Sequence, residues 1–215
     1  MQDAEAFGKA LAESQKRLYA DVRLQYMRDE SATRGNILEA LDLIAEHVRV
    51  DTSDQTLTII LYSTHGIVID RRFYLVPYGF NITSRNTMEE SAISSSDFTE
   101  KIRNIARYGR VLLLVDACYS GALREVANMD NVSVLTSSRN EDELSLEDPE
   151  WRHGAFTKAF LDALAGGADP QGQGVIRMST LVDSMDSALL ALTHGRQRLG
   201  LHVNFGGDLL FVVGK

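Results

Sequence analysis

The sequence predicts an α/β domain with a mainly parallel sheet and helices on both of its faces. The length of 215 residues suits one sizeable domain. Two short apolar runs rich in leucine, isoleucine and valine, at 56–62 and 111–115, are typical of strands buried on both faces. Segments with helical periodicity separate the expected strands, and this alternation implies crossover connections between parallel neighbours.

The elements follow from the spacing of apolar residues along the chain. Apolar residues recur with helical spacing in five segments, at 4–18, 33–47, 96–108, 154–164 and 179–192. Shorter apolar or alternating runs predict a hairpin at 68–76 and strands at 21–26, 56–62, 111–115, 131–137 and 209–213. Thr33 is the expected N-cap of its helix. The connection at 121–130 carries no clear pattern and is expected to be irregular.

Composition and charge exclude several classes of protein. The formal net charge is -8 and no run of Lys and Arg occurs, which argues against a nucleic-acid-binding domain. No stretch approaches the roughly 18 apolar residues that cross a bilayer, and no signal peptide is recognisable. We therefore expect a cytoplasmic protein with neither nucleic-acid nor membrane partners. The single cysteine excludes an internal disulfide and a multi-cysteine zinc site.

Candidate catalytic residues follow the two buried strands. Ser63-Thr-His65-Gly66 comes after the first and Asp116-Ala-Cys118-Tyr-Ser-Gly121 after the second. If the strands are parallel neighbours, His65 and Cys118 emerge at the same sheet edge, where α/β proteins gather catalytic groups. A cysteine nucleophile needs a nearby imidazole to take its proton. The main-chain N–H groups of Gly66 and Cys118 would then form an oxyanion hole.

Each of these residues also has a plainer interpretation. A histidine after a strand is more often a surface or hydrogen-bonded residue, and a lone cysteine more often packs in a core. The joint occurrence favours chemistry, because both residues end buried strands and both lie beside a glycine-containing turn. His153 is a weaker candidate for the base, because the sequence after it is typical of a helix entry with two inward-facing phenylalanines.

These motifs resemble those of caspase-like cysteine peptidases. Tyr62-Ser-Thr-His-Gly66 is similar to their histidine segment, although Thr64 stands where the family usually has glycine. Asp116-Ala-Cys-Tyr-Ser-Gly121 resembles the cysteine motif of the metacaspase branch, especially its bacterial members, and the histidine lies about 50 residues upstream, as in caspases. Weaker similarity occurs in segments at 2–7, 32–37, 137–147 and 153–157.

The resemblance implies a caspase-like three-layer sandwich forming one peptidase domain over 1–215. Its large-subunit-like part would span 1–121, its connector 122–130 and its small-subunit-like part 131–215. Family members normally begin with a buried strand that this chain lacks. We therefore expect the chain to be part of a longer polypeptide.

The resemblance also implies cleavage after Arg or Lys, because the metacaspase branch binds such side chains in an acidic pocket. Asp116, Ser63 and the loop residues Glu141, Asp142 and Glu143 are the corresponding substrate-binding candidates. Asp116 could instead be a structural carboxylate, Ser63 a plain turn hydroxyl, and the acidic loop simply solvated. The same loop could supply oxygen ligands for activating Ca²⁺, although it lacks an EF-hand pattern. No other cofactor or metal is expected.

Two other functions are compatible with parts of this pattern. A caspase fold without activity could serve as an adaptor or interaction module, since a fold alone does not establish activity. The presence of both His65 and Cys118 favours the enzyme. A serine hydrolase would need a Gly-x-Ser-x-Gly turn, and the residues around Ser120 do not match it.

Overall fold

The computed structural model describes residues 2–51, 56–140, 144–148, 151, 153–204 and 209–213. The chain divides into two compact units. We call Met27–Leu144 with Gly200–Gly206 the sheet unit, and Met1–Tyr26 with Ser145–Leu199 and Gly207–Lys215 the helix-rich unit.

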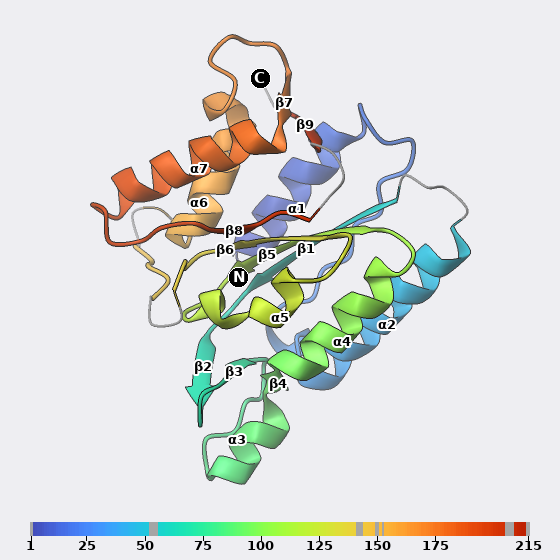
Figure 1. Cartoon of the computed structure of the whole chain (residues 1–215), viewed down its shortest axis with the longest axis vertical. Helices are drawn as coiled ribbons and strands as arrows, with labels where there is room; N and C mark the ends of the chain where they lie inside the picture. Colours follow the sequence, from blue (N-terminus) through green and yellow to red (C-terminus); the bar gives the residue numbers. More distant parts are fainter. Residues whose placement is uncertain are drawn as a thin grey trace. The chain divides into compact units, whose positions relative to one another are not determined.

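The sheet unit is built on a four-stranded sheet in the order β1-β5-β6-β8 (Figure 1). Strands β1 (Leu57–Ser63), β5 (Arg110–Asp116) and β6 (Val132–Thr136) are parallel, and β8 (Gly200–His202) runs antiparallel to β6. The residues of β5 from Val111 to Val115 are completely buried, which explains their continuous apolar sequence.

Helices α2 (Arg34–Val50) and α4 (Ser95–Ala106) pack side by side in this unit, and α5 (Arg124–Ala127) contacts α4 and β6 (Figure 1). Thr33 caps α2 by accepting a hydrogen bond from the Asn36 N–H at 3.3 Å, and Ser94 caps α4 in the same way. Short 3₁₀ turns lie at Asp29–Ser31 and Ser120–Ala122. The apolar faces of α2 and α4 share one core with β5 and β6.

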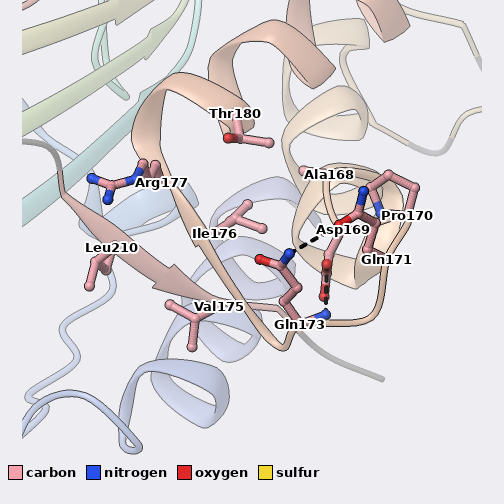
Figure 2. Close-up of a pocket in the computed structure, with 10 residues that line it drawn as sticks. All are labelled: Ala168, Asp169, Pro170, Gln171, Gln173, Val175, Ile176, Arg177, Thr180 and Leu210. Carbon is pink, nitrogen blue, oxygen red and sulfur yellow. Dashed lines mark hydrogen bonds between the residues drawn. The ribbon is translucent and has the colours of Figure 1, made fainter.

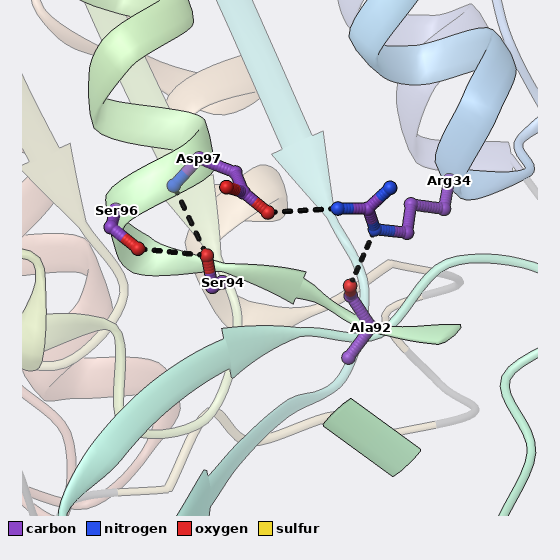
Figure 3. Close-up of polar contacts among 5 residues, drawn as sticks. All are labelled: Arg34, Ala92, Ser94, Ser96 and Asp97. Atoms are coloured by element: carbon purple, nitrogen blue, oxygen red, sulfur yellow. Dashed lines mark hydrogen bonds and ion pairs between the residues drawn. The ribbon is translucent and has the colours of Figure 1, made fainter. Parts of the chain in front are cut away.

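A smaller antiparallel sheet follows β1. It contains β2 (Gly66–Ile69), β3 (Arg72–Leu75) and β4 (Ile93–Ser94), with α3 (Arg85–Ser91) before β4. Arg34, next to the N-cap of α2, donates to the Ala92 carbonyl at 3.0 Å and pairs with Asp97 of α4 at 2.8 Å (Figure 3). One guanidinium thereby joins α2, the start of β4 and the first turn of α4.

The helix-rich unit contains α1 (Gln2–Gln15), α6 (Ala155–Asp162), a π-helical turn (Ala163–Gly167) and α7 (Met178–Leu192). The rings of Phe7 and Phe160 stack with their centroids 4.6 Å apart. Strands β7 (Val175–Arg177) and β9 (Leu210–Val212) form an antiparallel pair. The buried side chain of Gln15 ties α1 to β9 through hydrogen bonds with the Val212 carbonyl and N–H.

The structure confirms the predicted fold class, a mixed α/β architecture whose mainly parallel sheet is flanked by helices. All five predicted helices, the hairpin and the buried strands at 56–62, 111–115 and 131–137 are present within a few residues. The predicted division of the chain at residues 121 and 131 stays a prediction.

One strand prediction needs correction. Residues 21–26 form no strand, because a strand needs a hydrogen-bonded neighbour as well as alternating side chains. Leu24 and Tyr26 lie against Gly8 of α1. The strand predicted at 209–213 is present as β9, and it pairs with β7. The connection at 121–130, expected to be irregular, contains the short helix α5.

Candidate active site

The two predicted catalytic motifs leave neighbouring strands at the same edge of the sheet. Strands β1 and β5 are parallel, and their last residues, Ser63 and Asp116, are paired in register. The Thr64 N–H donates to the Asp116 carbonyl at 3.0 Å, which continues the pairing beyond the strands. His65 and Cys118 each come two residues after this pair, so the expectation that their loops meet at one edge is fulfilled.

Gly66 brings the two loops into direct contact. A Cβ placed on Gly66 would lie 2.1 Å from the Cys118 carbonyl oxygen and 2.7 Å from a ring carbon of Phe73. No side chain fits between backbones that approach so closely, and only glycine allows this spacing. Gly66 therefore sets how near the loop of His65 lies to the loop of Cys118.

Hydrogen bonds fix the backbone of the histidine loop. The Val76 N–H donates to the His65 carbonyl at 3.0 Å, and the Thr64 hydroxyl donates to the Val76 carbonyl at 2.6 Å. Because bonded and non-bonded pairs alternate in an antiparallel ladder, a bonded His65–Val76 pair leaves the Gly66 N–H directed away from β3. The His65 side chain is exposed to solvent. Thr64, the departure from the family pattern, serves here as a hydrogen-bond donor.

The cysteine loop turns sharply after β5. Cys118 is half-buried, and the next residue, Tyr119, has a left-handed backbone with φ 61°. This conformation is uncommon for an aromatic residue and persists only when its surroundings hold it. The loop then enters a 3₁₀ turn at Ser120–Ala122. The buried hydroxyls of Ser137 and Ser138, just after β6, contact this loop.

Two of the five predicted specificity residues, Asp116 and Ser63, are among the described residues. Asp116 is 6% exposed, whereas its register partner Ser63 is exposed. Paired residues of neighbouring strands point to the same face of a sheet, so both side chains lie on one face at the candidate site. Glu141, Asp142 and Glu143 lie outside the described residues. Among the described residues, no cluster of His, Cys, Asp and Glu could hold a metal ion.

Tyr62 lies on β1 just before the site and packs edge-on against Phe98 of α4, with ring centroids 5.8 Å apart. Its buried hydroxyl has no hydrogen-bond partner within the described part of the chain. Burial raises the pKa of Tyr62 above its ordinary value, because the phenolate would lose its hydration. The phenol is therefore neutral at physiological pH.

An open cavity of about 480 Å³ lies elsewhere, in the helix-rich unit between the loop at 168–174 and strands β7 and β9 (Figure 2). The Asp169 carboxylate accepts hydrogen bonds from the N–H groups of Gln173 and Gly174. Those bonds brace the loop, and none of the predicted catalytic residues lines this cavity.

His153, the alternative base, precedes Gly154, the N-cap of α6. Phe156 and Phe160 of that helix are completely buried, as expected for a helix entry. The sequence interpretation overlooked Ser137 and Ser138. The one available signal was the polar run Thr136-Ser-Ser138 at the end of a mostly apolar strand, where polar side chains need buried partners.

None of the described helices is long and apolar enough to cross a bilayer. A search of the curated proteins gave no match. The chain is similar to the crystal structure of protein GSU0716 from Geobacter sulfurreducens, with a TM-score of 0.60, 16% identity, and coverage of 99% of this chain and 83% of that one. At this identity the likeness concerns the fold alone. The family model of the caspase domain matches residues 1–200, and the chain therefore belongs to the caspase-domain family.

Proposed function

We propose that the chain is a cysteine endopeptidase in which Cys118 is the nucleophile and His65 the general base and acid. Family membership points to a cysteine peptidase that acts on proteins or peptides. The observation that carries the residue assignment is the contact of Gly66 with the Cys118 carbonyl, which brings the two loops together. The single cysteine of the chain leaves no other thiol for this role.

The proposed reaction is acyl transfer to the thiol. The Cys118 thiol loses its proton to His65, and the thiolate attacks the scissile carbonyl. The N–H groups of Gly66 and Cys118 donate to the oxyanion, which is supported by the Gly66 N–H being unused by the β2–β3 ladder. Protonated His65 gives its proton to the leaving amine. It then takes a proton from the water that hydrolyses the thioester.

We further propose a metacaspase-like preference for Arg at the residue before the scissile bond, followed by Lys. Support comes from the position of Asp116, a carboxylate at the end of β5 directly beside the cysteine motif, since a carboxylate is the group that a guanidinium recognises best. Ser63 on the same face could accept a further hydrogen bond from that group. Glu141, Asp142 and Glu143, which the family resemblance adds to this pocket, lie outside the described residues.

The test compares fluorogenic peptides that carry Arg, Lys or Asp before the cleaved bond. Wild-type protein and Cys118→Ala are assayed with calcium and with a chelator. We expect cleavage after Arg, weaker cleavage after Lys, and loss of both in Cys118→Ala. Cleavage that survives in Cys118→Ala would refute the nucleophile, and preference for Asp would refute the pocket. A wild-type protein inactive under all conditions would favour a non-catalytic adaptor.

A further inference from the structure

Three serine hydroxyls form a buried cluster beneath the cysteine loop. Ser120 belongs to the loop, and Ser137 and Ser138 follow β6; all three are 0% exposed. Buried hydroxyls are unfavourable unless they are hydrogen-bonded, so such a cluster persists only when its members satisfy one another or the backbone. Here each of the three hydroxyls has a partner.

Ser137 makes two hydrogen bonds with Ala117, the residue that precedes Cys118. Its Oγ accepts a hydrogen bond from the Ala117 N–H at 3.1 Å and donates one to the Ala117 carbonyl at 3.1 Å. The N–H and the carbonyl of Ala117 are thus both bonded to a single side chain just beyond the end of β6. The Ser137 N–H donates to the Val115 carbonyl at 2.9 Å, which fixes Ser137 itself to β5.

Ser138 holds the other end of the loop. Its Oγ accepts from the Gly121 N–H at 3.2 Å and lies 3.1 Å from the Ser120 hydroxyl. A Cβ on Gly121 would meet the Arg139 carbonyl at 2.7 Å, so the backbones are in close contact here too. Cys118 and Tyr119 lie between the two held ends.

One arrangement of protons satisfies the whole cluster. Ser138 donates to Ser120, Ser120 donates to Ser137 over 3.4 Å, and Ser137 donates to the Ala117 carbonyl. Each hydroxyl then uses its single proton, and the chain of bonds joins both ends of the loop. Bonds in such a chain polarise and strengthen one another, so removal of one hydroxyl weakens the rest.

We infer that Ser137 and Ser138 are positioning residues for the nucleophile. They hold residues 117–121 in the conformation that directs the Cys118 thiol and its N–H toward the scissile carbonyl. This inference rests on the proposed peptidase function. Because the cluster is fully buried, it reaches the substrate only through the loop, and its loss changes kcat and not KM.

The test compares Ser137→Ala and Ser138→Ala with Ser133→Ala. Ser133 is an equally buried serine of β6 whose hydroxyl accepts from the Asn204 N–H and, within the described part of the chain, makes no hydrogen bond to residues 117–121. Each of the three variants removes one buried serine hydroxyl. We expect Ser137→Ala to lower kcat about tenfold or more with KM changed less than about twofold, since misplacement of the nucleophile by a fraction of an ångström is enough. Ser133→Ala should keep kcat within about twofold of the wild type.

Amide hydrogen exchange measured by NMR gives a second readout that needs no substrate. We expect faster exchange at Ala117 in Ser137→Ala and at Gly121 in Ser138→Ala, with neither change in Ser133→Ala. Equal kcat and equal exchange in Ser137→Ala and Ser133→Ala would overturn the inference. If the wild-type protein cleaves no peptide, the proposed function fails, and unchanged exchange at Ala117 and Gly121 would overturn the positioning role as well.

Discussion

Replacement of Gly66 by alanine tests how the two loops are held together. The added methyl carbon would lie 2.1 Å from the Cys118 carbonyl oxygen, whereas ordinary contacts begin at 3.4 Å. Phe73, 2.7 Å from the same carbon, is 3% exposed and packs in the core, which limits its movement. The loops must therefore separate by about 1 Å, a displacement that lowers catalytic rates roughly 100-fold.

Gly66→Ala is accordingly expected to lower kcat/KM for an Arg peptide by about 100-fold, equivalent to about 2.7 kcal/mol in the activation free energy. Overpacking should also lower the free energy of unfolding by about 1–3 kcal/mol, measured by urea denaturation. The far-ultraviolet circular dichroism spectrum should stay unchanged, which would separate a displaced loop from an unfolded protein.

Gly35→Ala is the matched control. Gly35 lies in α2, and a Cβ there would meet nothing within 4 Å. The same substitution should raise the free energy of unfolding by about 0.5–1 kcal/mol, because alanine favours the helix, and leave kcat/KM unchanged. Activity of Gly66→Ala within threefold of that of Gly35→Ala would refute the close-contact reasoning.

Three further predictions concern Tyr62, Thr64 and Arg34. Tyr62→Phe should raise the free energy of unfolding by about 1 kcal/mol, because it removes a buried hydroxyl that has no partner among the described residues and keeps the ring. Since burial raises the pKa of Tyr62, the contribution of its neutral form to the free energy of unfolding should be fully present below about pH 10 and decline at higher pH. An equally steep decline in Tyr62→Phe would contradict this. Thr64→Val should lower kcat several-fold by removing the hydrogen bond to the Val76 carbonyl, with Thr64→Ser near wild type; equal kcat in both variants would show that the bond is unimportant. Arg34→Met should lower the free energy of unfolding by about 1 kcal/mol, and with it the thermal midpoint, because it removes the half-exposed ion pair with Asp97 and the hydrogen bond to the Ala92 carbonyl. An unchanged midpoint would show that these contacts do not stabilise the protein.

The main helices and strands could be predicted from the sequence, and so could the edge of the sheet at which the two candidate motifs lie. The apolar runs that became β1 and β5 are long, continuous and buried, and such patterns have few alternative interpretations. The motifs after those runs then share an edge because parallel neighbours end together. That inference needed only the order of elements and the rule that strands joined by a crossover lie parallel.

Other features depend on tertiary contacts that no local pattern encodes. Residues 21–26 alternate like a strand, yet alternation cannot reveal whether a partner strand is available. The pairing of β9 with β7, and not with the central sheet, is likewise decided by distant residues. The role of Ser137 was hidden because a serine after a strand is unremarkable until its hydroxyl is found bonded to both polar groups of Ala117.

Covalent trapping of the nucleophile tests the central claim most directly. An acyloxymethyl ketone peptide with Arg at its reactive end should add once to the protein, and peptide mapping should place the adduct on Cys118, the only cysteine. Labelling should be lost in Cys118→Ala and greatly slowed in His65→Ala, whereas His47→Ala, which removes an exposed histidine of α2, should label as the wild type does. An adduct on another residue, or equal labelling rates in His65→Ala and wild type, would contradict a Cys118–His65 peptidase.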